Sequence, residues 1–429
     1  MQQSAQVALG AGLLHHIPGN ERIAHFMIPR NFPGRGKVAV LKTQPETVLS
    51  DIGEVMHLAG YQDALPRDAE TLLKINISWQ TWYPACSTTP WQLEGVIRTL
   101  HADGYEKLIG AQNNTVVVDA YVGERNNKHK YVVDKYDVEN VHLYEPHVEW
   151  VRYQPKSPFL VLDQIFPDGV KIPKMFIGRN IIQLPTVKTH VFTTITGAMK
   201  NAFGGLLSER RHWTHSVIDE TLVDLLQIQQ DIHTGLFAVM DGTFAGDGAG
   251  PRAMRPHEKD ILLGSADQVA IDAISAKLQG FNPMDLPFIR IAHEQGLGVG
   301  EPKDIEIAGY DISLEDWKFV KEDTFASMGQ HLIYHGPFKR FERALLQSPL
   351  VPWSLFASNF YHNVYWYPVV GRKRVKQALT TRWGELFTSY GDGRVVLPGP
   401  EPGPTAIAAA GAAGMVAATA LAVRAARRG

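Results

Sequence analysis

The stretch of sequence that decides the fold runs from residue 180 to residue 205 and reads NIIQLPTVKTHVFTTITGAMKNAFGG. Its first five residues, Asn180–Leu184, form an apolar run of the length and composition typical of a buried β-strand. Lysine, histidine, threonine and glycine residues follow directly. Because ligands of open α/β sheets bind beyond the carboxyl ends of the strands, this order predicts a functional site at the edge of a sheet.

Similar apolar runs recur along the chain and alternate with amphipathic segments of helical length. We predict further strands at Lys37–Leu41, Leu72–Ile77, Lys107–Ala111, Leu236–Met240, Ile261–Leu263 and Ile305–Ala308. We predict helices from Pro90 to Asp103, over Ser216–Ile232 and over Asp267–Leu278. This alternation is typical of βαβ units and predicts an α/β fold with largely parallel sheets and flanking helices.

The length of the chain predicts more than one packed unit. Its 429 residues exceed the roughly 250–300 residues at which a single core stops growing, so we expect two packed subdomains. We divide the chain into an N-terminal extension (1–36), an α/β core (37–311), an aromatic-rich C-terminal region (312–396) and a Pro/Gly linker with an Ala-rich tail (397–429). Within the core, Asn126–Pro158 has no clear period and is expected to form an excursion or a seam between subdomains.

Composition and charge exclude several classes of protein. The 42 Lys and Arg residues are balanced by 44 Asp and Glu residues, so we expect no nucleic-acid partner and only a local group of cations for any anion. The single cysteine, Cys86, excludes an internal disulfide framework and a Cys-rich metal cluster. The first 22 residues do not follow the pattern of a signal peptide, so a cytoplasmic protein is expected, while the oligomeric state stays open.

The residues after Leu184 supply the first candidate site. Lys188 and Lys200 can neutralise a phosphate or a carboxylate, and Asn201 is assigned to the same ligand site. His190 can transfer protons or bind a metal, and the nearby glycines let the backbone approach a ligand. The alternative is a surface turn with ordinary solvated lysines. No Walker sequence and no Gly-x-Gly-x-x-Gly pattern occurs here, so a standard nucleotide loop is not supported.

A second group of cations precedes the helix predicted at Ser216. Arg211 and His215 belong to this group, and His212 is an alternative to His215 for the same role. Anions favour helix N-termini, so these cations are predicted to hold a phosphate or a carboxylate there. The alternative is a solvated basic loop.

A third group follows the strand predicted to end near Ile77. Lys74 and Asn76 leave this strand, and Thr88 and Thr89 stand directly before the helix that begins at Pro90. These side chains are candidates for contacts with an anionic ligand, whereas the alternative is that the two hydroxyls only cap the helix. Cys86 is a weaker candidate for a nucleophile, because no neighbouring base is obvious.

Four aspartates are candidates for metal or acid–base chemistry or for structural roles. Asp241 ends a predicted strand, and Asp247 lies in the segment Gly246–Pro251, which we expect to be a glycine-rich loop. These two carboxylates could bind a metal or act as acid and base, but tight turns also favour Asp beside Gly. Asp267 and Asp272 are expected to be a helix cap and a buried contact beside a helix.

These segments together resemble the domain of unknown function 362 family over roughly Lys37 to Ala308. The resemblance rests on Lys74-Ile75-Asn76, Thr88-Thr89-Pro90, Lys188-Thr189-His190, Gly197-Ala198-Met199-Lys200-Asn201 with Phe203-Gly204, His215, Asp241-Gly242, Gly248 to Pro251, and Asp267 with Ala270 and Asp272. Many members of that family also carry a ferredoxin-like cysteine-rich segment for iron–sulfur clusters. This chain has only Cys86, so no internal iron–sulfur cluster is expected.

The order His190, Gly197, Lys200 and His215 is also similar, more distantly, to the nickel-pincer lactate racemase family. In that family a strand-end histidine precedes a glycine-rich turn and a lysine that tethers the cofactor. The similarity implies Lys200 as the tether of a nickel-pincer-like nucleotide, His190 as a proton-transfer residue and His215 as a metal ligand. The stretch Ile109–Asn113 offers amides where that family has its second catalytic histidine, which argues against a two-base racemization.

The chain after Asp311 differs in character from the core. Its aromatic residues lie near the basic run Arg372–Arg374 and include Trp353, Phe356, Phe360, Tyr361, Tyr365, Trp366 and Tyr367. This region either packs on the core or forms an amphipathic surface at a membrane interface. The uncharged, Ala-rich segment 405–423 has the length of a marginal membrane span, so membrane association through it is one expectation and a solvated or interfacial helix is the alternative.

The leading hypothesis is an enzyme of unknown reaction that binds a small anionic ligand. Lys188, Lys200 and Arg211 would hold the anionic group, while His190 or His215 would transfer protons or bind a metal of unknown identity. The alternative is a non-catalytic ligand-binding or membrane-associated scaffold that uses the same cations. The first hypothesis predicts that the candidate side chains line one cleft.

Overall fold

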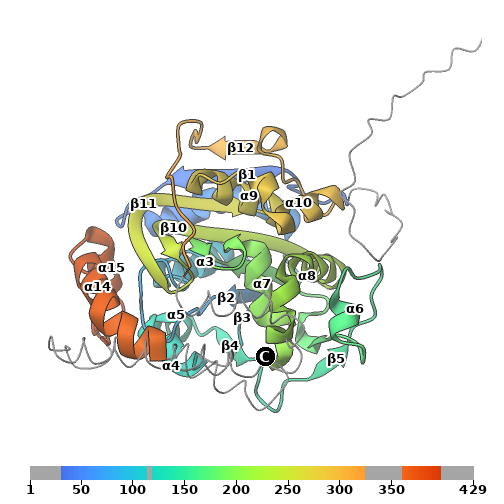
Figure 1. Ribbon diagram of the computed structural model, residues 1–429, viewed down its shortest axis with the longest axis horizontal. Coiled ribbons are helices and arrows are strands. Elements are labelled where there is room, and N and C mark those ends of the chain that lie inside the picture. The colour runs from blue at the N-terminus through green and yellow to red at the C-terminus, as the bar shows by residue number, and fades with distance from the viewer. Residues whose placement is uncertain (1–29, 114–117, 324–359, 398–429) are drawn as a thin grey trace, which may run out of the picture.

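The computed structural model describes residues 30–113, 118–323 and 360–397. Ten strands of this part of the chain form one sheet (Figure 1). They are β1 (Lys37–Lys42), β2 (Thr71–Ile75), β3 (Leu108–Gln112), β4 (Glu139–His142), β7 (Asn180–Leu184), β8 (Thr186–His190), β9 (Thr194–Ile195), β10 (Gly235–Ala249), β11 (Ala253–Ser265) and β12 (Glu306–Gly309). A separate pair is formed by β5 (Trp150–Arg152) and β6 (Lys171–Pro173).

The strands are ordered β12-β1-β11-β10-β7-β2-β3-β4 across the sheet, and β8 pairs with both β10 and β9. From β10 to β4 every neighbouring pair is parallel, and β8 is also parallel to β10. Strand β11 runs antiparallel to both of its neighbours, β1 and β10. The predicted α/β fold with a largely parallel sheet is therefore confirmed.

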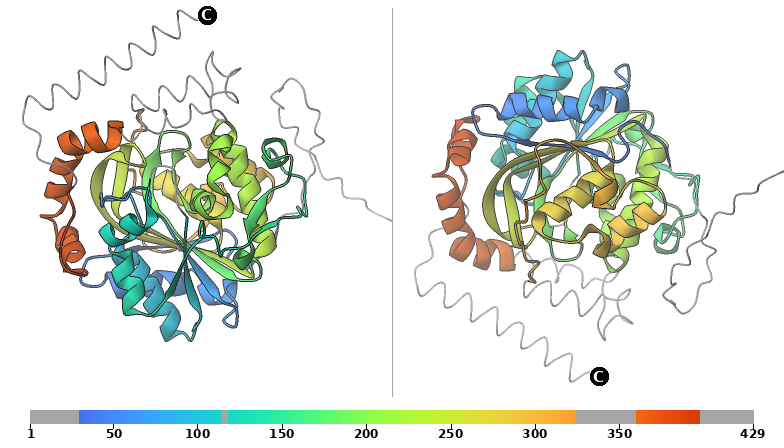
Figure 2. Two further views of the ribbon diagram at one scale, coloured as in Figure 1. Left: turned by 90° about the horizontal axis from the view of Figure 1, so that it is seen from below. Right: turned by 90° about the horizontal axis from the view of Figure 1, so that it is seen from above.

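Helices cover both faces of the sheet, as the two views of Figure 2 show. The α-helices are α1 (Val48–Leu58), α2 (Tyr61–Ala64), α3 (Pro90–Ala102), α4 (Ala120–Asn126), α5 (His129–Lys135), α6 (Leu162–Ile165), α7 (Ala198–Leu206), α8 (Ile218–Ile232), α9 (Gln268–Gln279), α10 (Pro287–Glu294), α14 (Arg372–Ala378) and α15 (Arg382–Ser389). Shorter 3-10 helices span Lys174–Phe176, Glu209–Val217, Pro283–Asp285 and Pro302–Asp304, and a π-helix spans Phe360–Gly371.

The alternation of side chains along each strand divides the apolar residues into two cores. In β7, Ile181 belongs to the core beneath α7, α8, α9 and α10, whereas Ile182 belongs to the core beneath α1, α3 and α5. In β10, Ala238 and Val239 are divided between the same two cores. One sheet thus separates two buried layers, and the expectation of two packed subdomains stays a prediction.

Polar side chains fix the starts of the helices that carry or support the candidate site. The Thr89 side chain accepts a hydrogen bond from Gln92 and forms a capping box with it at the start of α3. Asp267 caps α9 by accepting hydrogen bonds from two backbone N–H groups, so its predicted role as a cap is confirmed. Asp272, which is buried in α9, accepts hydrogen bonds from the backbone N–H groups of Ala198 and Met199 at 2.6 and 3.1 Å. That contact anchors the N-terminus of α7 to α9 and confirms the predicted buried contact of Asp272.

One segment that we expected to be a loop is mostly a strand, and a further strand follows Pro185, where a surface turn was the alternative. The chain resumes as β8 directly after Pro185, and the supposed glycine-rich loop Gly246–Pro251 is mostly the distal half of β10, with its turn only at residues 250–252. The glycines serve close packing between strands rather than a flexible loop. A Cβ atom at Gly250 would lie 1.8 Å from the backbone oxygen of Thr189.

The segment Asn126–Pro158 is more regular than its sequence predicted. It contains α5 and the edge strand β4, which pairs with β3 in parallel. This part therefore contains regular structure although its sequence has no clear period, and the expectation of an excursion or a seam between subdomains stays a prediction.

Most described aromatic residues of the C-terminal region pack on the core that contains α1 and α3, namely Tyr361, Tyr365, Trp366, Tyr367, Trp383, Phe387 and Tyr390. Trp317 and Phe319 pack on the other core. Phe387 stacks on Trp82 with ring centroids 4.1 Å apart, and the ring centroids of Trp383 and Trp91 are 5.3 Å apart. Trp353 and Phe356 lie outside the described residues, as does the segment 405–423. Within the described ranges, no helix combines the length and the apolar character needed to cross a membrane.

We predict that Asp272→Ala lowers the free energy of unfolding by about 2–5 kcal/mol, because two buried N–H groups at the start of α7 lose their acceptor. Asp272→Asn keeps one oxygen acceptor and should lose less. Urea denaturation followed by far-UV circular dichroism measures both values. Exposed Asp68, replaced by Ala, is the control; equal stability of Asp272→Ala and the wild type would contradict this role.

Candidate functional site

Six cationic or titratable side chains gather at the carboxyl ends of β2 and β8. We name them the cationic cluster: Lys74 of β2, Lys188 and His190 of β8, Lys200 of α7, and Arg211 and His215 of the 3-10 helix Glu209–Val217. These side chains lie close enough to affect one another's pKa values. The charges of Lys188 and Arg211 contribute to the lowered pKa of Lys200, and those of Lys200 and His215 contribute to the lowered pKa of His190. The location agrees with the sheet edge predicted from the sequence.

The three lysines of the cluster differ in their contacts. The Lys188 ammonium donates hydrogen bonds to the backbone oxygen of Cys86 at 3.0 Å and to the Thr186 hydroxyl at 2.6 Å. The Lys74 ammonium donates to the backbone oxygen of Ile75 at 2.5 Å. A Cβ atom on Gly205 of α7 would lie 3.0 Å from Cε of Lys74, so the missing side chain makes room for this lysine.

Lys200 projects from the first turns of α7, and its ammonium lies 5.8 Å from the centre of the Phe203 ring. Among the described residues, no ion pair involves Lys74, Lys188 or Lys200. The nearby charges that act on Lys74 and Lys200 are themselves positive. These three lysines therefore concentrate positive charge without a carboxylate partner among the described ion pairs.

Removal from water disfavours the protonated form of each of the three lysines. Removal from water lowers the pKa of Lys74 to about 7, and the charge of Arg211 adds to this effect. Removal from water also lowers the pKa of Lys200 to about 7, helped by the charges of Lys188 and Arg211. For Lys188 burial lowers the pKa to about 8. The three lysines consequently titrate near neutral pH instead of near pH 10.

The two histidines of the cluster are both neutral but are held in opposite tautomers. Burial, with neighbouring cations, lowers the pKa of His190 well below its usual value, and burial lowers the pKa of His215 to about 4. Nδ1 of His190 accepts hydrogen bonds from the backbone N–H groups of Phe192 at 3.1 Å and Thr193 at 3.4 Å, which assigns the proton of the neutral ring to Nε2. Nδ1 of His215 lies 2.9 Å from the backbone oxygen of His212 and must donate to it.

These contacts give the two rings different chemistry at their Nε2 atoms. Nε2 of His190 carries a proton and is a hydrogen-bond donor, whereas Nε2 of His215 carries a lone pair and is an acceptor. The ring of Phe192 lies near both, with centroid distances of 5.8 Å to His190 and 5.6 Å to His215. The pair thus combines a neutral donor with a neutral base.

The polar residues predicted for the site contact the protein instead. The Thr88 hydroxyl donates to the backbone oxygen of Leu184 at 2.6 Å and accepts from the backbone N–H of Asn76 at 2.9 Å. The Thr89 hydroxyl caps α3 and donates to the carboxylate of Asp241. Thr89 therefore has the capping role stated as the structural alternative, whereas the Thr88 hydroxyl connects β7 with Asn76 and does not cap α3.

Asn201 and Cys86 also have structural contacts. The Asn201 side chain donates to the backbone oxygen of Lys74 at 2.8 Å and to the side-chain oxygen of Gln183 at 2.9 Å, so it ties α7 to β2 and β7. Cys86 is buried, and burial raises the pKa of its thiol to about 11. A thiolate nucleophile is thereby disfavoured.

The two aspartates considered for a metal or for acid–base catalysis lie apart and have partners. Asp241 is buried and accepts hydrogen bonds from Trp91 Nε1 and the backbone N–H of Thr243. Asp247 forms an ion pair with Arg255 at 2.8 Å. No group of three or more His, Cys, Asp or Glu side chains within the described ranges is placed to hold a metal ion.

Two further cations near the cluster were missed by the sequence analysis. Nε of Arg252 donates to the backbone oxygen of Ser78 at 3.0 Å, and its charge acts on Cys86, which Lys188 also contacts. The charge of Lys321 contributes to the lowered pKa of His190. Arg252 directly follows the segment Gly246–Pro251, which the sequence analysis had singled out, whereas no local pattern marks Lys321.

Comparisons with known proteins give three similarities. A thylakoid-associated protein of Synechocystis sp. is 25% identical over 183 residues, which are 40% of this chain and 54% of that protein. The chain therefore spans about half the length of this curated relative. A crystal structure of a Thermotoga maritima protein from a structural genomics programme covers 58% of this chain and 59% of its own, with 10% identity and a TM-score of 0.34.

The resemblance to the nickel-pincer lactate racemase family stays a prediction.

The third similarity concerns a family model described as "Domain of unknown function (DUF362)". It matches residues 71–277, a range that extends from β2 to α9 and includes every member of the cationic cluster.

Proposed function

We propose that this chain is an enzyme that binds a small polyanionic substrate, bearing phosphate or carboxylate groups, at the cationic cluster. The observation that carries this proposal is that Lys74 and Lys188 are buried and Lys200 is half-buried, without a carboxylate partner among the described ion pairs. The reaction itself is not assigned.

Free-energy arguments favour a ligand over a structural role for these lysines. An ammonium group taken out of water costs several kcal/mol unless it is paired, and apolar side chains of similar size would stabilise the same position better. A cluster of such groups at the carboxyl edge of the sheet is typical of a site that awaits an anion. The anion would supply the negative charge that the described residues do not.

The opposite tautomers of the histidines support acid–base chemistry on the bound anion. In this proposal His215 accepts a proton through Nε2, while His190 donates a hydrogen bond from Nε2 to an oxygen that gains negative charge. A pKa of about 4 makes His215 a weak base in the ligand-free protein. A bound anion would offset the charges of Lys200 and Arg211 that depress this pKa, so base strength would rise on binding.

We predict that Lys200→Ala weakens binding of inorganic pyrophosphate roughly ten- to a hundredfold, because a charge-assisted hydrogen bond contributes about 1.5–3 kcal/mol. Isothermal titration calorimetry measures the affinity. Lys200→Arg keeps the charge and should retain part of the affinity, whereas the covalent tether of the racemase hypothesis would be lost in both variants, as seen by intact mass.

The exposed lysine Lys303, replaced by Ala, is the control for a general loss of positive charge. Oxalate titrated in parallel tells a carboxylate site from a phosphate site. If Lys200→Ala binds both anions as tightly as the wild type, the assignment of Lys200 to the site is wrong.

We predict that anion binding at pH 8 takes up about two protons, because Lys74 and Lys200, with pKa values of about 7, are then mostly neutral and a bound anion favours their charged forms. Affinity should accordingly fall at least about tenfold between pH 7 and pH 9. Titrations in buffers of different ionisation enthalpy count the protons. Binding without proton uptake would contradict the buried lysines as ligands.

The same lowered pKa values determine whether the stability of the ligand-free protein rises or falls with pH. Unfolded lysines bind protons up to about pH 10, whereas the buried lysines release them near pH 7 to 8. The unfolded state therefore holds more protons across this window, and the stability of the ligand-free protein should rise as the pH increases through it.

A membrane-associated protein is a second candidate function. It is favoured by the name of the Synechocystis relative, which is described as thylakoid-associated, and by the uncharged segment 405–423 of this chain. In this alternative the cationic cluster holds a phosphate-bearing ligand without catalysis.

We predict that deletion of residues 404–429 leaves the fold intact, because the segment follows a Pro/Gly linker and supplies no motif to the core. Circular dichroism checks the fold, and fractionation of cells that express the full-length or the shortened chain measures membrane attachment. A smaller membrane fraction for the shortened chain would support the second candidate, while identical partitioning would exclude the segment as an anchor.

A further inference from the structure

Residues 317–322, which we name the strap, cross the distal half of β10. The backbone N–H of Gly248 donates to the backbone oxygen of Val320 at 3.1 Å, and Lys321 pairs with Gly248 in a parallel bridge. Phe319 is buried against the ring of His257, with centroids 5.1 Å apart. The strap thus joins the sheet by both backbone and side-chain contacts.

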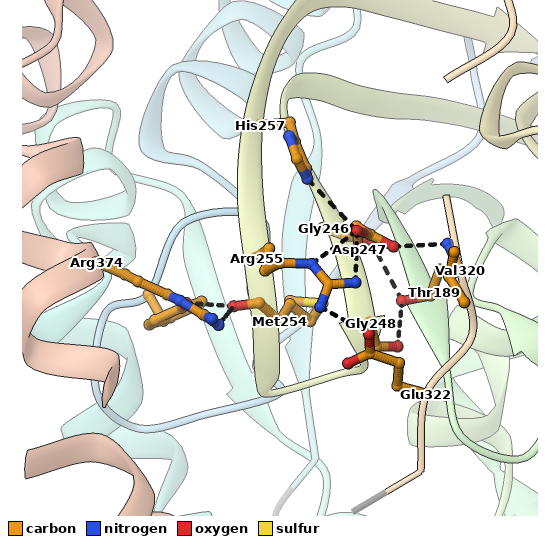
Figure 3. Close-up of polar contacts among 11 residues, drawn as sticks. Thr189, Gly246, Asp247, Gly248, Met254, Arg255, His257, Val320, Glu322 and Arg374 are labelled. Carbon is orange, nitrogen blue, oxygen red and sulfur yellow. Dashed lines mark hydrogen bonds and ion pairs between the residues drawn. The ribbon is translucent and has the colours of Figure 1, made fainter. Parts of the chain in front are cut away.

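A set of charged groups holds the strap in this place (Figure 3). One carboxylate oxygen of Asp247 accepts from the backbone N–H of Val320 at 2.7 Å, while the other accepts from Nε of Arg255 at 2.9 Å. Arg255 also pairs with Glu322 of the strap at 2.7 Å. Asp247, which is largely buried, therefore links β10 to the strap directly. It also orients Arg255, which forms a second contact with the strap through Glu322.

The register of β10 brings the strap next to the cationic cluster. One edge of β10 is occupied by β11, which pairs with it as far as Ala249. Along the other edge Gly246 pairs with Lys188, and two residues further Gly248 pairs with Lys321. The Thr189 hydroxyl donates to the backbone oxygen of Gly248 at 2.8 Å, so the end of β8 and the strap meet at one residue of β10.

We propose that the strap is the closing wall of the anion site, that Lys321 is a further ligand-binding cation, and that Asp247 is the positioning residue that holds it there. This inference rests on the proposed function and deepens it. The charge of Lys321 acts both on His190 and on Asp219 at the start of α8, which agrees with a position between the cluster and that helix. The strap would add to the site a cation that is remote in sequence from the other members.

Titration with inorganic pyrophosphate tests the role of Lys321. Lys321→Ala should weaken binding roughly tenfold, Lys321→Arg should retain most of the affinity, and Lys303→Ala should match the wild type. If Lys321→Ala binds like the Lys303→Ala control while Lys200→Ala binds weakly, the strap is not part of the site although the proposed function stands. If Lys200→Ala also binds like the wild type, the proposed function itself fails.

Hydrogen exchange tests the role of Asp247. Asp247→Ala should speed exchange of the Val320 amide and weaken pyrophosphate binding, while Asp247→Asn should restore much of both, since its side-chain oxygen can still accept from Val320. Pyrophosphate should slow exchange in residues 317–322 of the wild type. Unchanged exchange in the strap on binding, or equal affinity of Asp247→Ala and the wild type, would overturn the proposal.

Discussion

The pairing of β10 is the constraint on which the rest of the described structure depends. A strand has only two edges that can form hydrogen bonds, and β11 occupies one of them along most of β10. The other edge is shared in succession by β7, β8 and the strap. Pro185 lies where the chain passes from β7 to β8, and a proline fits such an interruption because it has no N–H group for a ladder.

This succession along one edge explains why the cations meet. β8 continues beyond the end of β7, so Lys188 and His190 are carried past the carboxyl edge of β2, where Lys74 lies. Helix α7 then returns over the same edge with Lys200, and Asp272 fixes its first turn. Strand pairing and the contact of Asp272 with α7 thus bring the charged side chains of the cluster together. Apolar packing on both faces of the sheet supports this arrangement.

The burial of the lysines in the cluster is unfavourable for the stability of the ligand-free protein. Burial without a carboxylate partner lowers the pKa of each lysine, which is unfavourable for the ligand-free protein but leaves the positive charge available to an anion. The histidines are controlled differently. Hydrogen bonds with main-chain groups fix their tautomers, so His190 and His215 keep neutral rings whose Nε2 atoms have opposite hydrogen-bonding character.

The sequence by itself determined the α/β class, the strand Asn180–Leu184 and the helix that follows Pro90, because apolar periodicity and caps are local signals. It also selected Lys188, His190, Lys200 and His215, since polar residues after a strand end point to the sheet edge. It did not separate β8 or the distal half of β10 from loops, because their glycines and threonines suit both.

Tertiary structure alone decided which of these residues gather in the cationic cluster and which support the frame. The hydroxyls of Thr88 and Thr89 are taken up by contacts with β7 and with Asp241, which are remote in sequence. The charge of Lys321 reaches His190 only because Lys321 pairs with Gly248. Such contacts join segments far apart along the chain, and no local pattern of residues encodes them. Only the register of β10 fixes where they meet.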